Sequence, residues 1–278
     1  MALLTSFFSG KRKVLACSLL IILAQYVSSQ SLAQNNELAF GNGETLEYTV
    51  SYHWGFIWVD AGEVRFKATK LKDQRWHYLC TASSYQRYDW LFKVRDTFET
   101  ISKPEPLLPS IYRGRTMEGS IESVSEYYFN EQHTSLLIKS READEVISKT
   151  LKINDQISDV LTATYKTRSI DWQRFAFGEG IILQMIMNNA LLQLPVNYVA
   201  KDTLKLSTGE TFACLQFDAS LPEGSIFMAG EAIRVWVSDD KNRLPVRIEA
   251  KIKIGSIEIQ LAKYQQLAHP LHSLQNKK

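Results

Sequence analysis

The sequence contains few of the residues and motifs from which catalytic sites are built. Its 278 residues include five histidines and three cysteines, and they lack GxSxG, HExxH, Walker, CxxC and complete GxGxxG patterns. These absences leave no reaction that the sequence specifically predicts. We therefore expect a protein that is not an enzyme and that uses no cofactor or metal.

Charge of one sign is also lacking. The formal net charge of the full chain is +2, and loss of residues 1–33 would lower Lys plus Arg from 32 to 29 against 30 Asp plus Glu. A nearly neutral chain with interspersed charges has no electrostatic footprint for nucleic acid. We expect no nucleic-acid partner.

The N-terminus carries a targeting pattern. Residues 1–33 contain basic residues at Lys11–Lys13, an apolar stretch over 14–27 and small residues that end at Ala33. This order is typical of a secretory signal peptide, cleaved after Ala33 or, as second choice, after Ser29. The stretch is shorter than the ~20 residues that span a bilayer. We expect an exported protein that does not span a membrane after cleavage.

The few cysteines allow one disulfide in the exported chain. Cys17 lies near the beginning of the apolar stretch, whereas a lipidated cysteine would end it, and it leaves with the signal peptide. Cys80 and Cys214 remain, and an oxidising compartment permits a disulfide between them. The alternative is two separate buried thiols, because the sequence does not bring the two Cα atoms within bonding reach.

Most of the remaining chain alternates apolar and polar residues with a period of two. The alternation is clearest in Leu244–Ile254, where Val246 and Ile248 face one way and Arg247 and Glu249 the other. Such segments form strands with one dry face and one wet face. Further strands are predicted at Leu46–Trp54, Val64–Ala68, Trp76–Ser83, Leu91–Thr100, Leu108–Thr116, Ile121–Phe129 and Thr134–Lys139. The fold class is therefore all-β and mostly antiparallel, with a strongly curved sheet or open β-roll.

The chain is predicted to form a single β-rich domain over residues 34–268. It has an N-terminal sheet over 44–139 and a C-terminal sheet over 181–264, and we expect residues 269–278 to be a disordered tail. The charged Arg141–Glu145 region is expected to be a loop.

Two segments depart from the simple strand pattern. Residues 156–168 have a helical apolar face, with Asp155 or Ser158 as the candidate N-cap, so one helix is expected to pack against the sheet. Ile181–Val199 is the most apolar part of the exported chain, and Asn188 and Asn189 favour a hairpin turn there. An amphipathic helix on a membrane is the alternative, but it would lack a basic face.

Aromatic and apolar residues give the candidate ligand site. Trp54, Phe56 and Trp58 flank Gly55 in a very apolar loop that could form the mouth of a ligand site, although buried packing is the commoner role. An adaptable apolar lining is predicted from three residues of the hairpin. These three residues are Ile182, Met185 and Met187.

Two polar groups require comparison with known sites. Ser51 and His53 share the wet face of a strand, but the sequence shows no third member of a triad and no oxyanion hole. Asp239 and Asp240 with Asn242 resemble a cation loop, yet they lack the spacing of a calcium site and are common turn residues. We expect neither group to be a catalytic or metal site.

Several sequence motifs resemble those of the exported bacterial family known as domain of unknown function 3108. They lie at Gly43–Phe66, Ser207–Phe217, Pro222–Phe227 and Val235–Leu261, and so bracket nearly all of the exported chain. The resemblance implies a periplasmic protein of a Gram-negative bacterium with no established activity. It also implies a curved sheet around an apolar interior, similar to that of periplasmic lipoprotein carriers. The lack of a lipobox favours a soluble protein.

Two functions remain open. The first is a non-catalytic binding module that holds a lipid or other hydrophobic molecule inside the curved sheet. The second is a structural or protein-interaction component of the cell envelope with a fully packed core. The two differ in whether side chains or a guest molecule fill the concave side of the sheet.

Overall fold

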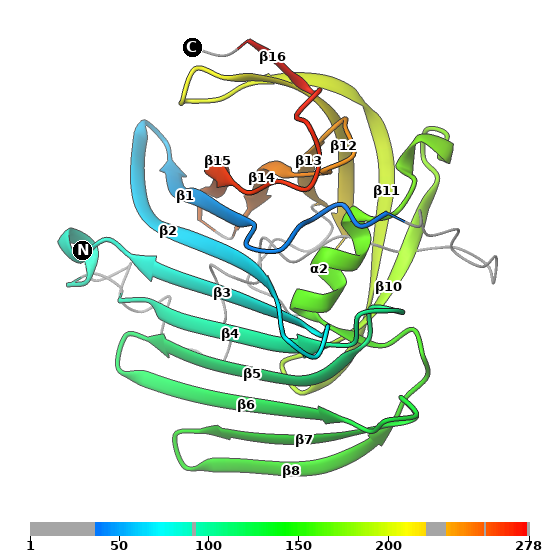
Figure 1. Ribbon diagram of the computed structural model, residues 1–278. Helices are drawn as coiled ribbons and strands as arrows, with labels where there is room; N and C mark the ends of the chain where they lie inside the picture. Colours follow the sequence, from blue (N-terminus) through cyan, green and yellow to red (C-terminus); the bar gives the residue numbers. More distant parts are fainter. Residues whose placement is uncertain (1–36, 91–92, 221–231, 253, 277–278) are drawn as a thin grey trace.

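The computed structural model describes residues 37–276 except 91–92, 221–231 and 253. One 16-stranded, mostly antiparallel sheet curves around the helix α2 (Figure 1). This architecture confirms the predicted fold class. The predicted signal peptide, residues 1–33, and Cys17 lie outside the described residues. No helix in the described ranges is long and apolar enough to cross a membrane.

The strands follow one another along the chain with short connections. Two 3₁₀ turns, η2 (Gln86–Tyr88) and η3 (Trp172–Arg174), complete the elements. The strands and the helix are β1 Thr45–Trp54, β2 Ile57–Lys70, β3 Trp76–Ser84, β4 Arg95–Ser102, β5 Pro109–Glu118, β6 Ile121–Phe129, β7 Ser135–Glu142, β8 Glu145–Lys152, β9 Ser158–Asp159, α2 Val160–Arg168, β10 Gly180–Met187, β11 Ala190–Lys205, β12 Thr211–Ser220, β13 Ala232–Ser238, β14 Pro245–Lys251, β15 Ser256–Gln265 and β16 Leu274–Asn276.

The predicted N-terminal and C-terminal sheets are one continuous sheet. The strand order is β8-β7-β6-β5-β4-β3-β2-β1-β15-β14-β13-β12-β11-β10-β9, with β16 paired to β12. The junction is the pairing of the first strand with β15, from Thr45 opposite Gln265 to His53 opposite Ser256. Because β1 lies in the middle of the sheet, the N-terminal strands are joined to the C-terminal strands through β1 and β15.

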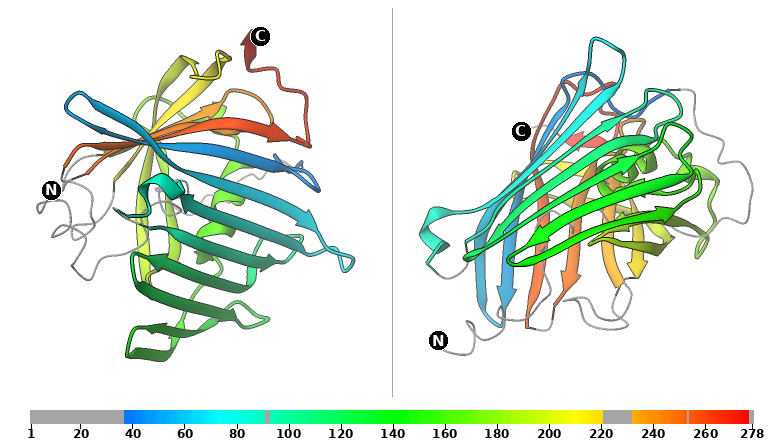
Figure 2. Two further views of the ribbon diagram at one scale, coloured as in Figure 1. Left: turned by 90° about the vertical axis from the view of Figure 1, so that its left-hand side faces the viewer. Right: turned by 90° about the horizontal axis from the view of Figure 1, so that it is seen from below.

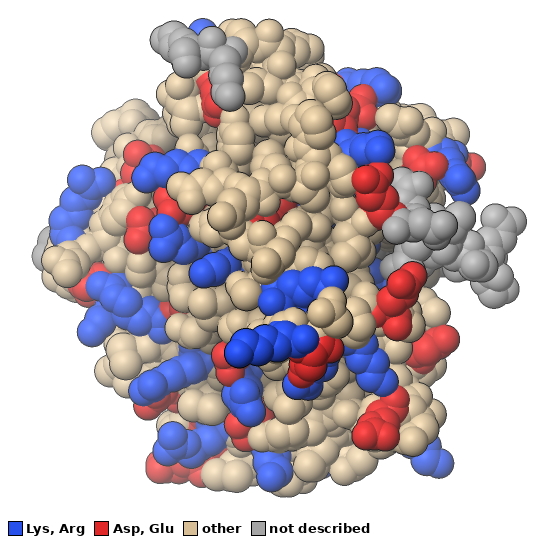
Figure 3. Space-filling model, in the orientation of Figure 1, with Lys and Arg blue, Asp and Glu red and all other residues tan. Residues whose placement is uncertain are grey.

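The alternation of apolar and polar residues in the sequence corresponds to the alternation of buried and exposed side chains along the strands. In β3 the residues Trp76, Tyr78, Cys80 and Ala82 are buried, and the residues between them are partly exposed. Inward-facing side chains of this kind from most strands form one contiguous apolar cluster with α2. On the face shown in Figure 3, the outward-facing Lys, Arg, Asp and Glu side chains are interspersed.

The helix begins later than predicted and is more deeply enclosed. Its N-cap is Asp159, not Asp155 or Ser158, and residues 158–159 form the short strand β9. The Asp159 carboxylate accepts hydrogen bonds from the amides of Leu161 and Thr162. Eight of the nine helix residues are buried, because α2 lies inside the curve instead of covering one face of a sheet.

The Ile181–Val199 hairpin is confirmed. Its turn residues Asn188 and Asn189 have φ angles of 49° and 62°, which Asn tolerates better than most residues. The Asn189 side chain also bonds to Tyr127 Oη of β6 and to Ser140 Oγ of β7. This hairpin therefore bridges back to the opposite part of the curved sheet.

Two predictions about local order are wrong. Residues 141–142 and 145–152 form strand, and only a short turn remains of the loop expected at Arg141–Glu145. The tail predicted to be disordered is ordered through residue 276, because Asp240 accepts hydrogen bonds from the Ser273 amide and hydroxyl and β16 pairs with β12.

Candidate functional site

A buried ion pair lies at the centre of the fold, on the concave side of the sheet. Arg168, at the end of α2, donates from both terminal nitrogens to the two carboxylate oxygens of Glu44, at 2.6 and 2.9 Å. Its remaining donors reach the backbone oxygens of Ala39 and Asn242. Both charged side chains are almost fully buried. One guanidinium thus joins the helix, the N-terminal segment and the β13–β14 turn.

Aromatic rings fill the space beside this ion pair. The Tyr165 ring stacks on that of Tyr78 at 4.2 Å between centroids and meets Phe40 edge-on at 4.8 Å. The Arg168 guanidinium lies 5.9 Å from the Phe40 ring centroid and 5.6 Å from that of Tyr165. Side chains from α2 therefore occupy the place that a guest molecule would need.

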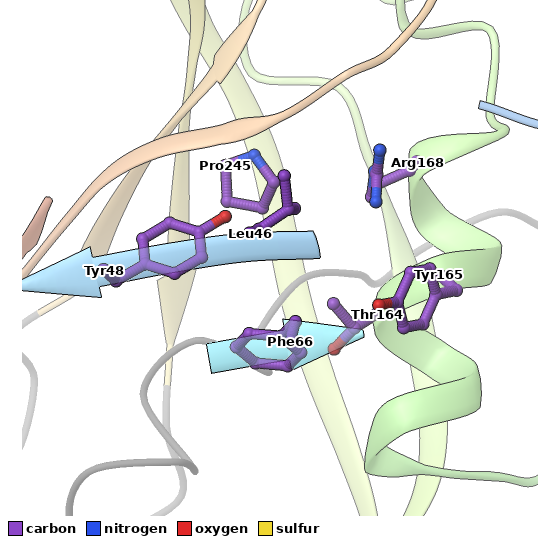
Figure 4. A pocket seen from close by; sticks show the side chains of 7 residues that line it. All are labelled: Leu46, Tyr48, Phe66, Thr164, Tyr165, Arg168 and Pro245. Atoms are coloured by element: carbon purple, nitrogen blue, oxygen red, sulfur yellow. The ribbon is translucent and has the colours of Figure 1, made fainter. Parts of the chain in front are cut away.

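A gap beside α2, inside the curve, is small. Its volume is about 10 Å³, which is room for roughly one water molecule. Figure 4 shows three of its lining residues projecting from α2 toward strands β1 and β2. Its lining residues are Leu46, Tyr48, Phe66, Thr164, Tyr165, Arg168 and Pro245.

A larger depression lies elsewhere on the molecule. It has a volume of about 340 Å³ and a lining with polar and charged side chains of β3, β4 and β5. Its lining residues are Thr81, Ala82, Ser83, Arg95, Asp96, Thr97, Arg115 and Met117. None of the six predicted ligand residues contributes to either space.

The predicted lining residues lie on opposite faces of β10. Met185 is fully buried and Met187 is half-buried on the same face, and both pack in the core. Ile182 has the opposite parity along the strand and points to the other face. These three side chains cannot line one cavity, and five strands separate β10 from β1 in the sheet order.

The predicted mouth residues form an exposed aromatic tip at the end of the β1–β2 hairpin, defined here as residues 54–58. Phe56 is 100 % exposed, Trp58 61 % and Trp54 49 %, so the alternative of buried packing is wrong. Trp58 lies against His53, with 3.3 Å between ring centroids. The register pairs Trp54 with Ile57 across the turn. The tip is an exposed apolar end of the hairpin.

Ser51 and His53 do not form a catalytic pair. The Ser51 hydroxyl donates to Asp60 Oδ1 at 2.7 Å, so the hydroxyl proton is directed to a carboxylate and not to an imidazole. Burial lowers the pKa of His53. Nucleophile activation requires the base to accept the hydroxyl proton, and this arrangement does not provide it.

The residues considered for a cation loop have structural partners. Asp240 accepts hydrogen bonds from the Asn242 amide and from the hydroxyls of Ser238 and Ser273. Asp239 accepts from Lys201 Nζ at 2.8 Å. The described residues contain no cluster of His, Cys, Asp and Glu that could hold a metal ion.

Residues 47–262 match the family described as "Protein of unknown function (DUF3108)". The match covers well over half of the sequence. The chain belongs to the DUF3108 family. No curated protein is significantly similar to it in sequence.

Solved structures resemble this DUF3108 chain only distantly in sequence. A β-barrel-like protein of the DUF1849 family from Brucella abortus has 7 % identity and a TM-score of 0.53, covering 81 % of this chain and 98 % of its own. A protein described as exported, with a YmcC-like fold, from Bacteroides fragilis has 8 % identity and a TM-score of 0.30, covering 81 % and 97 %. A protein described as a lipoprotein from Parabacteroides distasonis has 7 % and 0.27, covering 84 % and 100 %. The first likeness supports the β-barrel-like fold, and the other two scores do not establish a common fold.

Two of the motifs that carried the family resemblance meet in space at Arg168. Glu44 comes from the first of them and the Asn242 carbonyl from the last, and both accept hydrogen bonds from this one side chain. Sequence reasoning missed Arg168, because a single arginine at the end of a short helix is ordinarily an exposed residue. In this DUF3108 protein these two motifs therefore stabilise the fold, and the motif at Pro222–Phe227 lies outside the described residues.

Cys80 and Cys214 are two buried thiols with no disulfide between them. They lie on β3 and β12, which five strands separate in the sheet order. The structure therefore agrees with the alternative of two separate buried thiols. Burial raises the pKa of Cys214 to about 12. We expect both thiols of the folded, signal-free protein to resist Ellman's reagent and to react after unfolding in guanidinium without reductant. Absence of the two thiols from the unreduced, unfolded protein would indicate a disulfide.

A buried histidine gives a pH-dependent contribution to stability. His133 Nε2 lies 2.7 Å from the backbone oxygen of Ile157, and burial lowers the pKa of His133 below its ordinary value of 6.5. The unfolded chain therefore binds more protons as the pH falls below 6.5, and protonation favours unfolding. The contribution of His133 is complete above pH 6.5 and is lost as the pH falls toward the lower folded pKa.

We expect the change from pH 7 to pH 5 to lower the free energy of unfolding more in the unmodified protein than in His133→Asn. Asn tolerates the positive φ of 55° at this position and does not titrate. Urea unfolding at both pH values measures the difference. His53 shifts in the same direction, so the comparison with the variant isolates His133. An unchanged pH dependence would contradict the prediction.

Proposed function

We propose that this DUF3108 protein is a non-catalytic, exported component of the cell envelope that binds its partner through the outer surface, at the aromatic tip. The observation that carries the proposal is the contrast between the interior and the tip. Side chains inside the curve leave a gap of about 10 Å³, whereas three aromatic rings at the tip are exposed. An apolar patch exposed on a folded protein typically marks an interaction site. The predicted signal peptide supports location in the periplasm of a Gram-negative bacterium.

A lipid site inside the curved sheet has less support. A fatty acyl chain needs a pocket of several hundred cubic ångströms, whereas Tyr165 and its neighbours leave about 10 Å³. Met185, expected to line such a site, is fully buried in the core. A structural or interaction protein with a packed core agrees better with these side chains.

Titration with cis-parinaric acid tests where a hydrophobic ligand could bind. The variant carrying Phe56→Ala and Trp58→Ala removes apolar surface from the tip and leaves the interior unchanged. We expect no saturable one-to-one uptake by either protein. Saturable uptake that persists in the variant would contradict the proposal, because the ligand would then lie away from the tip and inside the fold.

A further inference from the structure

The aromatic tip is the end of an uncharged part of the β1–β2 hairpin, residues 52–59. A hydrogen bond between Ser51 and Asp60 marks its base, and residues 53–59 contain no Asp, Glu, Lys or Arg. Three residue pairs of the β1–β2 register lie beyond that bond. At about 3.4 Å per residue the uncharged part is roughly 10 Å long.

Neighbouring strands leave the end of the hairpin unpaired. β2 pairs with β3 only from Gly62 onward, and β1 pairs with β15 only as far as His53. In Figure 2 (left) the blue β1–β2 hairpin ends at the periphery of the molecule. Over Ile57–Asp60, one edge of β2 therefore has no strand partner among the described residues.

The loop beside the base of the tip adds a cation and further aromatic rings. Arg87 of η2 donates to the Asp60 carbonyl at 3.2 Å, and its guanidinium lies 4.9 Å from the Tyr88 ring centroid. Trp90, on the same loop, is 71 % exposed. An exposed arginine next to an apolar projection is suited to the phosphate groups of a lipid surface.

These features fit a bilayer better than a protein groove. Elements that bind at the surface of a bilayer bury their apolar face by about 5–10 Å, which is close to the length of the uncharged part of the hairpin. Tryptophan is favoured at the level of the lipid headgroups, and the two tryptophans flank a fully exposed Phe56. The unpaired edge of β2 can hydrogen-bond to water in the headgroup layer but not in the hydrocarbon core.

We propose that the aromatic tip inserts into the interfacial layer of a lipid bilayer, with Phe56 deepest, Trp54 and Trp58 among the headgroups and Arg87 near the phosphates. The proposal rests on the proposed function, since it names the partner of the same surface. It requires no cavity, and the packed interior is compatible with it.

Flotation with vesicles of phosphatidylethanolamine and phosphatidylglycerol in a 3:1 ratio tests the proposal. We expect the signal-free protein to float with the vesicles, and the Phe56→Ala, Trp58→Ala variant to bind at least about tenfold more weakly, since two large apolar side chains are lost. Phe177→Ala is the matched control, because Phe177 is also a strongly exposed phenylalanine, at 80 %. Binding of the control should equal that of the unmodified protein.

Three results would overturn the insertion proposal. In the first, the unmodified protein does not bind the vesicles. In the second, Phe177→Ala weakens vesicle binding as much as the tip variant does. In the third, vesicle binding disappears in 0.5 M NaCl but persists in the tip variant. The first result would favour a protein partner at the tip. A different result would contradict the proposed function, namely saturable uptake of cis-parinaric acid that persists in the tip variant.

Discussion

Glu44→Gln is expected to lower the free energy of unfolding by about 3–5 kcal/mol, the usual effect of removing one partner from a buried ion pair. The substitution leaves the Arg168 guanidinium without its countercharge. This is costly because both side chains lie almost entirely out of solvent. Urea unfolding followed by tryptophan fluorescence measures the change. A loss of this size is a large fraction of the stability of an ordinary domain.

The matched control is Glu47→Gln, three residues further along the chain. Glu47 lies on the outer face of β1 and pairs with Arg65, whose side chain is 61 % exposed. Exposed ion pairs contribute about 0–1 kcal/mol, so the control should change stability little. Similar effects of the two substitutions would show that the Glu44–Arg168 pair does not stabilise the fold as the structure indicates.

Tyr165→Ala is expected to destabilise the protein by about 3–5 kcal/mol, the range found when a buried aromatic ring is removed. The Tyr165 ring packs between Tyr78 and Phe40 on the concave side of the sheet. Its removal enlarges the small gap beside α2. If the variant remains folded, it should also bind a small apolar probe such as benzene, which the unmodified protein should not.

Tyr165→Phe separates the contribution of the ring from that of the hydroxyl. The Tyr165 hydroxyl is buried and has no hydrogen-bond partner among the described residues. Removing it therefore breaks no bond, and stability should change by less than about 1 kcal/mol. A loss in Tyr165→Phe as large as that in Tyr165→Ala would contradict ring packing as the main role of this residue.

The sequence predicted the strands well where an apolar face is buried by the chain itself. Trp76–Ser83 was predicted within one residue of the observed strand Trp76–Ser84, and the Asn188–Asn189 hairpin was also correct. In both cases the local pattern agrees with the final environment. The strand Glu145–Lys152 was missed because its residues are mostly exposed at the edge of the sheet, where little apolar periodicity is required.

Features that depend on distant contacts could not be predicted. The polar C-terminal segment is ordered because Asn242 and Asp240 bond to residues 269–273, some 30 positions away. The tip residues have the composition of a core, yet they are exposed because no other element extends over them. Sequence periodicity identifies an apolar face but does not show what covers it.

The candidate ligand site was predicted only in part, because sequence periodicity does not show what covers an apolar face. Trp54, Phe56 and Trp58 all lie at the tip, but the register places Trp54 opposite Ile57 and Trp58 opposite His53, so the two tryptophans are on opposite faces of the hairpin. Ile182 and Met185 were likewise grouped although their parity places them on opposite faces. Parity along β10 was readable from the sequence, but the helix that fills the concave side was expected only to pack against the sheet. The structure shows it enclosed, with eight of its nine residues buried.

Native mass spectrometry of the signal-free protein, purified from the periplasm without detergent, tests most directly whether its own side chains fill the interior. A packed interior predicts the mass of the polypeptide alone, for the unmodified protein and for the Phe56→Ala, Trp58→Ala variant. One equivalent of lipid that remains bound to the tip variant and is removed by organic solvent would contradict it, because that lipid would have to occupy the concave side of the sheet.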